Sequence, residues 1–220
     1  MSFTCKIDHD GLWLSVAFSR PLQIASWAVH RPGLVEADQI LWRKVNNSDL
    51  PLDVDPQVWL EKELSRRGAL DAVTMLTSCD IGNYRVYKAQ AEEAHVTAIC
   101  TAGLSNAERV GARLDWCKDG WGTINLAVVI EQGLQQWALF EAMSIASEAR
   151  TAAVYDADLQ IATGRATGTG TDCIALAAPQ GEASYAGLHT ALGEAIGKAV
   201  YQATSEAIVL WKQSKFGRAF

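Results

Sequence analysis

Two stretches in the second half of the chain repeat apolar residues at the spacing of an α-helix, and they restrict the possible folds more than any other feature. The first stripe consists of Leu134, Ala138, Ala142, Ile145, Ala149 and Ala152. The second consists of Leu192, Ile196, Ala199, Val200, Ala203 and Ala207. Because alanine dominates the first stripe, that helix can lie close to the surface it covers. The pattern predicts two long helices that need an apolar partner.

The strand-like runs of the chain mostly precede these helices and do not alternate strictly with them. Residues 4–18 read as a β-hairpin, and residues 83–103 as strand, loop, strand. Further strand-like runs lie at 22–29, 37–45, 71–78, 122–130 and 172–179. This order predicts an α+β fold with a largely antiparallel or mixed sheet covered by the two helices. A layered α/β/β/α sandwich, with two sheets back to back, is the alternative.

A third, shorter helix is predicted in the first third of the chain. Asp55 is suited to the N-cap and Pro56 to the first helical position, while Gly68 lies near the expected end. These three residues set the boundaries of the helix from local chemistry alone.

Length and charge restrict the class of protein. A chain of 220 residues fits one domain, here taken as 1–220. A net charge of −6 without a block of like charges argues against a nucleic-acid partner. No apolar run approaches the roughly 20 residues of a membrane span, and the N-terminus lacks the pattern of a secretory signal. We expect a cytoplasmic protein without a membrane partner, which could form a homo-oligomer.

Cysteine and tryptophan are both spread along the chain. The five cysteines never form C-x-x-C, so they indicate neither a disulfide framework nor a zinc knuckle. We expect reduced thiols, several of them buried. Most of the eight tryptophans are expected to anchor the core, and one or two could form a flat wall for a planar ligand.

Four small, polar segments lie at the ends of predicted strands. They are "TAGLSNAERVG" (101–111), "GTIN" (122–125), "ATGTGTD" (166–172) and "YAGLHTALGE" (185–194). Functional sites are commonly built from loop residues held by a rigid scaffold. The four segments together therefore predict a shared pocket.

The segment "ATGTGTD" alternates threonine with glycine and ends in Asp172. In an extended conformation Thr167, Thr169 and Thr171 would face one side. Their hydroxyls and the nearby backbone N–H groups could then bind a carbonyl, an amide or an oxyanion. The segment lacks the lysine of a P-loop and precedes a strand, so it does not indicate a phosphate-binding loop. A turn with surface hydroxyls is the simpler interpretation.

Several other side chains could take part in a reaction. His189 lies at the predicted start of the last helix and could act as a general acid or base. Glu148 belongs to a polar stripe of the first long helix, which is a solvated face unless it lines the pocket. Asn106 and Asn125 could cap turns or direct an amide at a substrate. No metal-ligand motif is present, and we expect no metal or cofactor.

Taken in order, the segments resemble the adenosylcobinamide amidohydrolase family. The matching text is "TAGLSNAERVG", "GTINLAVV", "ASEARTAAVYDAD", "ATGTGTDCIALAAP" and "YAGLHTALGEAIGKAV", which covers roughly Thr101 to Val200. The text "AVTMLTSCDIGNY" also resembles the strand and loop upstream. Arg150 stands where the family pattern has lysine, and "EQGL" stands where an asparagine-containing turn is commoner.

The resemblance implies hydrolysis of the amide between the propionyl arm of the corrin ring and the aminopropanol arm of adenosylcobinamide. The products would be adenosylcobyric acid and 1-amino-2-propanol, in the salvage of corrinoids for cobamide synthesis. A corrinoid would then be the small-molecule partner. A non-catalytic corrinoid-binding or carrier protein is the alternative function.

Three reaction schemes are open from the residues. Asp172 or Glu148 could activate water while His189 protonates the leaving amine and an asparagine holds the oxyanion. A hydroxyl of Thr169, Thr171 or Ser105 could attack as a covalent nucleophile. A metal could activate water through His189 and carboxylates. The candidate catalytic residues are Asp172, His189, Thr169, Thr171 and Glu148. The candidate substrate-binding residues are Ser105, Asn106, Arg109, Thr123, Asn125, Thr167, Gly168 and Gly170.

Overall fold

The computed structural model describes residues 3–46, 48–51, 53–114 and 122–216. The helices are α1 (Pro56–Arg67), α2 (Gln136–Asp156) and α3 (Ala191–Phe216), with a 3-10 turn η1 (Ile81–Asn83). The longer strands are β1 (Cys5–His9), β2 (Trp13–Ser26), β3 (Gly33–Lys44), β4 (Val73–Thr77), β5 (Arg85–Ala91), β6 (Ala94–Ala102), β8 (Ile124–Ile130) and β12 (Cys173–Ala178). The short strands are β7 (Ala107–Glu108), β9 (Gln160–Ile161), β10 (Gly164–Arg165) and β11 (Gly168–Thr169).

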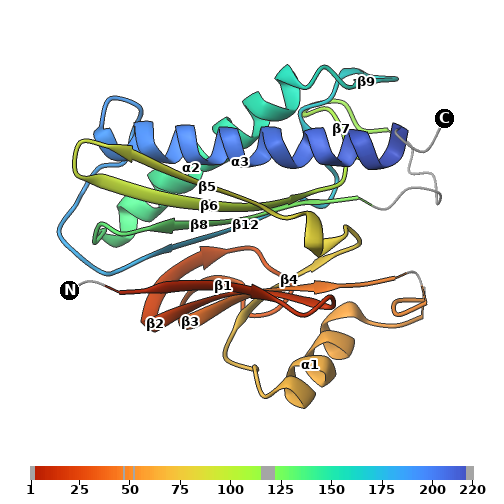
Figure 1. Cartoon of the computed structure of the whole chain (residues 1–220), viewed down its shortest axis with the longest axis horizontal. Helices are drawn as coiled ribbons and strands as arrows, with labels where there is room; N and C mark the ends of the chain where they lie inside the picture. Colours follow the sequence, from red (N-terminus) through yellow and green to blue (C-terminus); the bar gives the residue numbers. More distant parts are fainter. Residues whose placement is uncertain (1–2, 47, 52, 115–121, 217–220) are drawn as a thin grey trace.

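The longer strands form one mixed sheet in the order β4-β3-β2-β12-β8-β6-β5, with β1 paired to β2. The pairs β3–β4 and β12–β8 are parallel, and the other neighbours are antiparallel. In Figure 1 the elements lie in four layers: α2 and α3, then β5, β6, β8 and β12, then β1 to β4, then α1. The predicted α+β fold is confirmed. The two β layers are joined by hydrogen bonds between β2 and β12, so they belong to one sheet.

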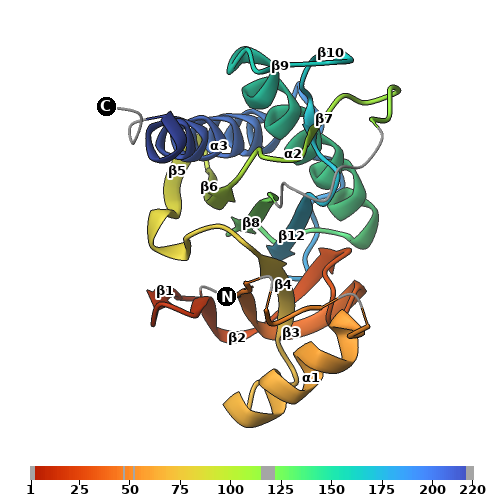
Figure 2. The same ribbon diagram turned by 90° about the vertical axis from the view of Figure 1, so that its right-hand side faces the viewer.

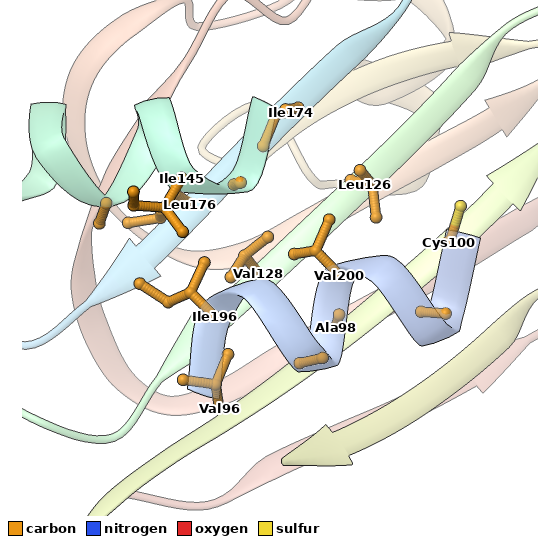
Figure 3. Close-up of a cluster of buried hydrophobic side chains, with 14 of the residues drawn as sticks. Val96, Ala98, Cys100, Leu126, Val128, Ile145, Ile174, Leu176, Ile196 and Val200 are labelled. Atoms are coloured by element: carbon orange, nitrogen blue, oxygen red, sulfur yellow. The ribbon is translucent and has the colours of Figure 1, made fainter. Parts of the chain in front are cut away.

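The central strands are buried on both faces because they lie between two cores. Val128 of β8 and Leu176 of β12 face the helices in the larger cluster, part of which Figure 3 shows. Their neighbours Val129 and Ala177 face the opposite way, into the cluster shared with β2 and β3. Successive side chains of a strand point to opposite faces, so this arrangement accounts for the uninterrupted apolar runs in β8 and β12.

The apolar stripes of the long helices are buried largely as predicted. All six stripe residues of α3 are buried. In α2 the prediction is wrong at Ala152, which is exposed, while Ala153 and Val154 are buried instead. At this end of α2 the covered face continues from Ala149 to Ala153, four residues later. Ala152, three residues after Ala149, is turned toward solvent.

Local chemistry sets the ends of α1 as predicted. The Asp55 carboxylate accepts hydrogen bonds from the backbone N–H of Gln57 at 2.8 Å and of Val58 at 3.3 Å. Gly68 takes the left-handed conformation, with φ of 70°, just past the last helical residue. The predicted hairpin is also present as β1 and β2. The run at 22–29 is not a separate strand, because β2 continues to Ser26 through an irregularity in its register with β3.

The cysteines that the structure describes are unpaired thiols, as predicted, and Cys117 lies outside the described residues. Burial raises the pKa of the Cys173 thiol to about 11, so this group stays protonated at neutral pH. Trp42 is fully buried, whereas Trp27 and Trp137 are exposed. Trp116 and Trp121 lie outside the described residues. Among the described helices, none has both the length and the apolar character needed to cross a bilayer.

Candidate active site

Three of the four polar segments meet at one end of the sheet. Strand β11, within 166–172, pairs with β7, within 101–111. The segment 122–125 joins them because β8 and β12 are parallel neighbours, with Asn125 opposite Cys173. The fourth segment, 185–194, follows the far end of β12. The candidate site is therefore built from 101–111, 122–125 and 166–172.

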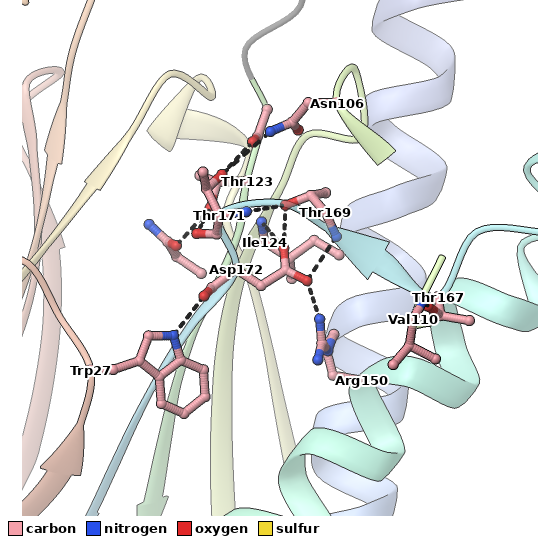
Figure 4. A network of polar contacts seen from close by, with 12 residues as sticks. Trp27, Asn106, Val110, Thr123, Ile124, Arg150, Thr167, Thr169, Thr171 and Asp172 are labelled. Carbon is pink, nitrogen blue, oxygen red and sulfur yellow. Dashed lines mark hydrogen bonds and ion pairs between the residues drawn. The ribbon is translucent and has the colours of Figure 1, made fainter. Parts of the chain in front are cut away.

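Asp172 is the centre of this site, and its side chain is only 7% exposed. Oδ1 accepts hydrogen bonds from the Ile124 backbone N–H at 2.9 Å and from the Thr169 hydroxyl at 2.5 Å. Oδ2 accepts one from the Thr169 backbone N–H at 2.9 Å and pairs with the guanidinium of Arg150 on α2 (Figure 4). With four donors on two oxygens, the carboxylate has little capacity left to bind and activate a water molecule directly.

The three threonine hydroxyls do not form one surface. The Thr171 hydroxyl donates to the carbonyl of Gly122 at 2.9 Å, while the Thr167 hydroxyl accepts from the backbone N–H of Val110 at 2.7 Å. Figure 4 shows Thr167 and Val110 away from the other two threonines. The expectation of a one-sided array required an extended segment, but β11 covers only Gly168 and Thr169. Each hydroxyl therefore has its own environment.

The two glycines of this segment differ in how closely they are packed. A Cβ on Gly168 would lie 2.5 Å from Nη1 of Arg150 and 2.6 Å from Oδ2 of Asp172. A Cβ on Gly170 would meet nothing closer than the Cγ of Glu108 at 3.9 Å. Gly168 is needed for the ion pair to form, whereas the fold places no such demand on Gly170.

We expect Gly168→Ala to lower the melting temperature by roughly 2–12 °C, because overpacking against the ion pair costs about 1–3 kcal/mol. Gly170→Ala provides the matched control and should melt at the wild-type temperature or up to about 4 °C above it, since its new methyl group makes only an ordinary contact with Glu108 and alanine restricts the unfolded chain. Differential scanning fluorimetry of the two variants measures the difference. Equal melting temperatures would contradict the packing role assigned to Gly168.

The two asparagines have different surroundings. Asn125 is 1% exposed, donates to the carbonyl of Leu76 at 2.8 Å and accepts from the Thr123 hydroxyl at 3.1 Å. Both ends of its amide are occupied, so Asn125 holds the scaffold, as does Thr123, which also bonds the carbonyl of Thr171 at 2.8 Å. Asn106 is half-buried, and its Nδ2 lies 3.4 Å from the Thr171 hydroxyl. Asn106 is thus the asparagine that a substrate can approach.

Three further candidates lie at the edges of the site. Ser105 is half-buried in the loop between β6 and β7. Arg109 donates to the carbonyl of Arg165 at 2.9 Å, so its guanidinium supports the β9–β10 hairpin. Glu148 is exposed on α2 and, among the described residues, forms no hydrogen bond or ion pair with the Asp172 cluster. Nothing in the contacts of Glu148 assigns it to the reaction.

His189 is not brought to this site. Asp172 precedes β12, whereas His189 lies in the connection from the end of β12 to α3. In that connection Gln180 and Ala183 bridge to Leu134, beyond the end of β8. The six residues of β12 alone separate the two ends by about 20 Å. A scheme in which Asp172 and His189 act together on one amide does not fit this geometry.

We expect His189→Ala to change kcat on the substrate proposed below by no more than about twofold, because the imidazole is exposed at the far end of β12. A general acid would cost about a hundredfold or more when removed. Steady-state turnover of the purified variant distinguishes the two. A hundredfold loss in a variant with normal melting would restore the scheme that uses His189.

Three residues near Asp172 were missed as site residues by sequence reasoning. In the sequence Arg150 stands out only as a departure from the family pattern, and its pairing with Asp172 is seen only in the structure. The Trp27 indole N–H donates to the carbonyl of Asp172 at 2.7 Å, across 145 positions of sequence, and no local signal predicts this contact. The Cys79 thiol lies 3.5 Å from the carbonyl of Thr123, and burial raises its pKa, which makes it a poor nucleophile.

Within the described ranges, no group of three or more His, Cys, Asp or Glu side chains is arranged to hold a metal ion. His189, which the metal scheme requires, is the residue that lies at the far end of β12.

Comparison with known proteins identifies relatives of the whole chain. The family model CbiZ, described as adenosylcobinamide amidohydrolase, matches residues 4–216. An uncharacterized protein of Methanocaldococcus jannaschii, MJ1613, is 30% identical over 197 residues, which cover 79% of this chain and 74% of that protein. The PH0078 protein from Pyrococcus horikoshii OT3 has a TM-score of 0.46 and 10% identity, covering 94% of this chain and 83% of that one. A likeness this weak carries no argument.

The match extends the resemblance found from the sequence in one respect. The motifs lie between Ala72 and Val200, whereas the family model also includes residues 4–71. Those residues supply α1 and strands β1 to β3, and Trp27 with them. The chain belongs to the adenosylcobinamide amidohydrolase family.

Proposed function

We propose that this protein hydrolyses the amide between the corrin propionyl arm and aminopropanol in adenosylcobinamide. The products are adenosylcobyric acid and 1-amino-2-propanol, and the reaction serves corrinoid salvage. Family membership supports the substrate class. The observation that carries the reaction class is the hydrogen bond of 2.5 Å between the Thr169 hydroxyl and the Asp172 carboxylate, which is a nucleophile in contact with a base.

The contacts of Asp172 favour a covalent route over direct attack by water. A water activated by Asp172 would have to displace one of its four donors. The Thr169 hydroxyl is already one of those donors, so its proton can pass along an existing hydrogen bond. Arg150 and the backbone N–H of Ile124 hold the carboxylate in place while this happens. Thr169 is therefore the nucleophile of the proposal, and Asp172 is its base.

The proposed reaction proceeds in two halves. Thr169 Oγ1 bonds to the amide carbon while its proton moves to Asp172, and the oxyanion accepts a hydrogen bond from the Asn106 amide. The C–N bond then breaks, the proton on Asp172 passes to the leaving amine, and the propionyl arm remains as an ester of Thr169. Water next attacks the ester and gives its proton to Asp172. The alkoxide of Thr169 leaves and recovers that proton, which restores the site.

The direct test is to incubate the purified protein with adenosylcobinamide, with and without a chelator, and to analyse the mixture by mass spectrometry. We expect adenosylcobyric acid and free aminopropanol in both samples. Product only in the sample without chelator would replace the threonine route by the metal route. A corrinoid that is bound but unchanged would identify the protein as a carrier. If the protein neither binds the corrinoid nor releases product, the substrate assignment is wrong.

A further inference from the structure

Trp27 combines an exposed ring with a fixed orientation. Its side chain is 49% exposed, although burial of an aromatic ring contributes more to stability than exposure does. The indole N–H is held by the carbonyl of Asp172 at 2.7 Å. The polar atom of the ring therefore has its partner within the protein, and what the ring offers to a ligand is an apolar surface.

The backbone beside Trp27 is fixed as well. Ser26, at the end of β2, donates from its hydroxyl to the carbonyl of Ile174 at 2.9 Å and accepts from the backbone N–H of Ala28 at 3.0 Å. Ser26 and Ala28 are both buried. The ring is thus held from its backbone and from its tip, so a ligand that rests on it does not have to order it first.

The position of Trp27 distinguishes it from the exposed rings of Trp137 and Tyr185. Trp137 is 59% exposed, but it lies in the first turn of α2, which follows the far end of β8. Tyr185 is 74% exposed in the connection after β12, at that same far end. Trp27 instead contacts the backbone of the residue whose side chain holds the Thr169 hydroxyl.

We propose that the Trp27 ring is the wall on which the corrin macrocycle rests while its propionyl arm reaches Thr169; this inference rests on the proposed function. The macrocycle is broad and presents an apolar face, with methyl groups and methylene stems between the amide arms of its rim, and the scissile amide lies at the end of one short arm. A site that places the amide at Thr169 needs an apolar surface next to Asp172. Trp27 supplies that surface in a fixed orientation.

The same geometry sets the orientation of the substrate in the site. In Figure 4 Trp27 and Asn106 lie on opposite sides of Asp172. Asn106 is half-buried, and its Oδ1 atom is buried, so the Nδ2 end of the amide is the one that a substrate can meet. The macrocycle therefore lies toward Trp27 and the leaving arm toward Asn106.

The test compares Trp27→Ala, Trp27→Phe and the control Trp137→Ala in steady-state turnover of adenosylcobinamide. We expect Trp27→Ala to raise KM about tenfold with kcat nearly unchanged, since the loss of an aromatic contact acts on binding. Trp27→Phe should keep most of the affinity, and Trp137→Ala should behave as the wild type. Phenylalanine has a ring but no N–H. If Trp27 served only to tether Asp172, both Trp27 variants would lose kcat to the same extent. That result would refute the proposed contact between the Trp27 ring and the macrocycle.

A second measurement separates this inference from the proposed function. Adenosylcobyric acid retains the macrocycle and lacks the aminopropanol arm, so Trp27→Ala should weaken its inhibition about tenfold, whereas the control Trp137→Ala should leave that inhibition unchanged. If the wild type binds adenosylcobinamide without turnover, the protein is a carrier. Equilibrium dialysis of the same variants then still tests whether the Trp27 ring contacts the macrocycle. If Trp27→Ala and the wild type bind the corrinoid with equal affinity, the role of Trp27 is overturned, whether the protein is a hydrolase or a carrier. The proposed function is not affected by that result. No corrinoid binding by the wild type would overturn both proposals.

Discussion

Thr169→Val is expected to lower kcat on adenosylcobinamide by at least about a thousandfold, because valine has nearly the shape of threonine but no oxygen to attack the amide. The hydroxyl lost is the one 2.5 Å from Asp172. Thr169→Ser should retain measurable turnover, since serine keeps the oxygen. The melting temperature of each variant should be measured beside kcat, so that loss of the nucleophile is distinguished from loss of the fold.

The matched control is Thr171→Val in the same loop. The Thr171 hydroxyl donates to the carbonyl of Gly122, accepts weakly from Asn106 at 3.4 Å, and is not among the hydrogen-bond donors to the Asp172 carboxylate. We therefore expect its loss to cost less than about tenfold. Acid quenching of the wild type during turnover should also trap an ester on the peptide that contains Thr169. Full activity of Thr169→Val, or an ester on a different residue, would contradict the proposed nucleophile.

Asp172→Asn is expected to reduce both turnover and stability. Turnover should fall by at least about a hundredfold, because the amide cannot accept the proton of Thr169. Stability should fall by about 3–5 kcal/mol, because Arg150, with its side chain 16% exposed, loses its counter-charge. For a chain of this length that corresponds to a decrease of roughly 6–20 °C in melting temperature. Thermal unfolding and kcat are measured on the same preparation.

A double variant separates the two roles of Asp172. In Asp172→Asn with Arg150→Gln the unpaired charge is gone, so part of the lost stability should return. Turnover should not return, because the base is still absent. An Asp172→Asn protein that melts and turns over like the wild type would show that the carboxylate neither holds the loop nor accepts a proton.

Features that depend on residues close together in the chain can be predicted from the amino-acid sequence. The ends of α1 follow from Asp55 and Gly68, which act within one helical turn of the backbone they cap. The buried face of α3 follows from a stripe that repeats every three or four residues. The family could also be identified, because its motifs are contiguous segments.

Which of the candidate residues meet depends on how the strands are ordered and paired in the folded protein. His189 and Asp172 were equally plausible partners in sequence, but β12 separates them. Asn106 and Asn125 both follow strands, and only their hydrogen bonds distinguish the accessible amide from the occupied one. Trp27 reaches Asp172 because β2 lies against β12 with Ser26 opposite Ala175. Such contacts depend on strand order and register over more than a hundred residues, and no local pattern in the sequence encodes them.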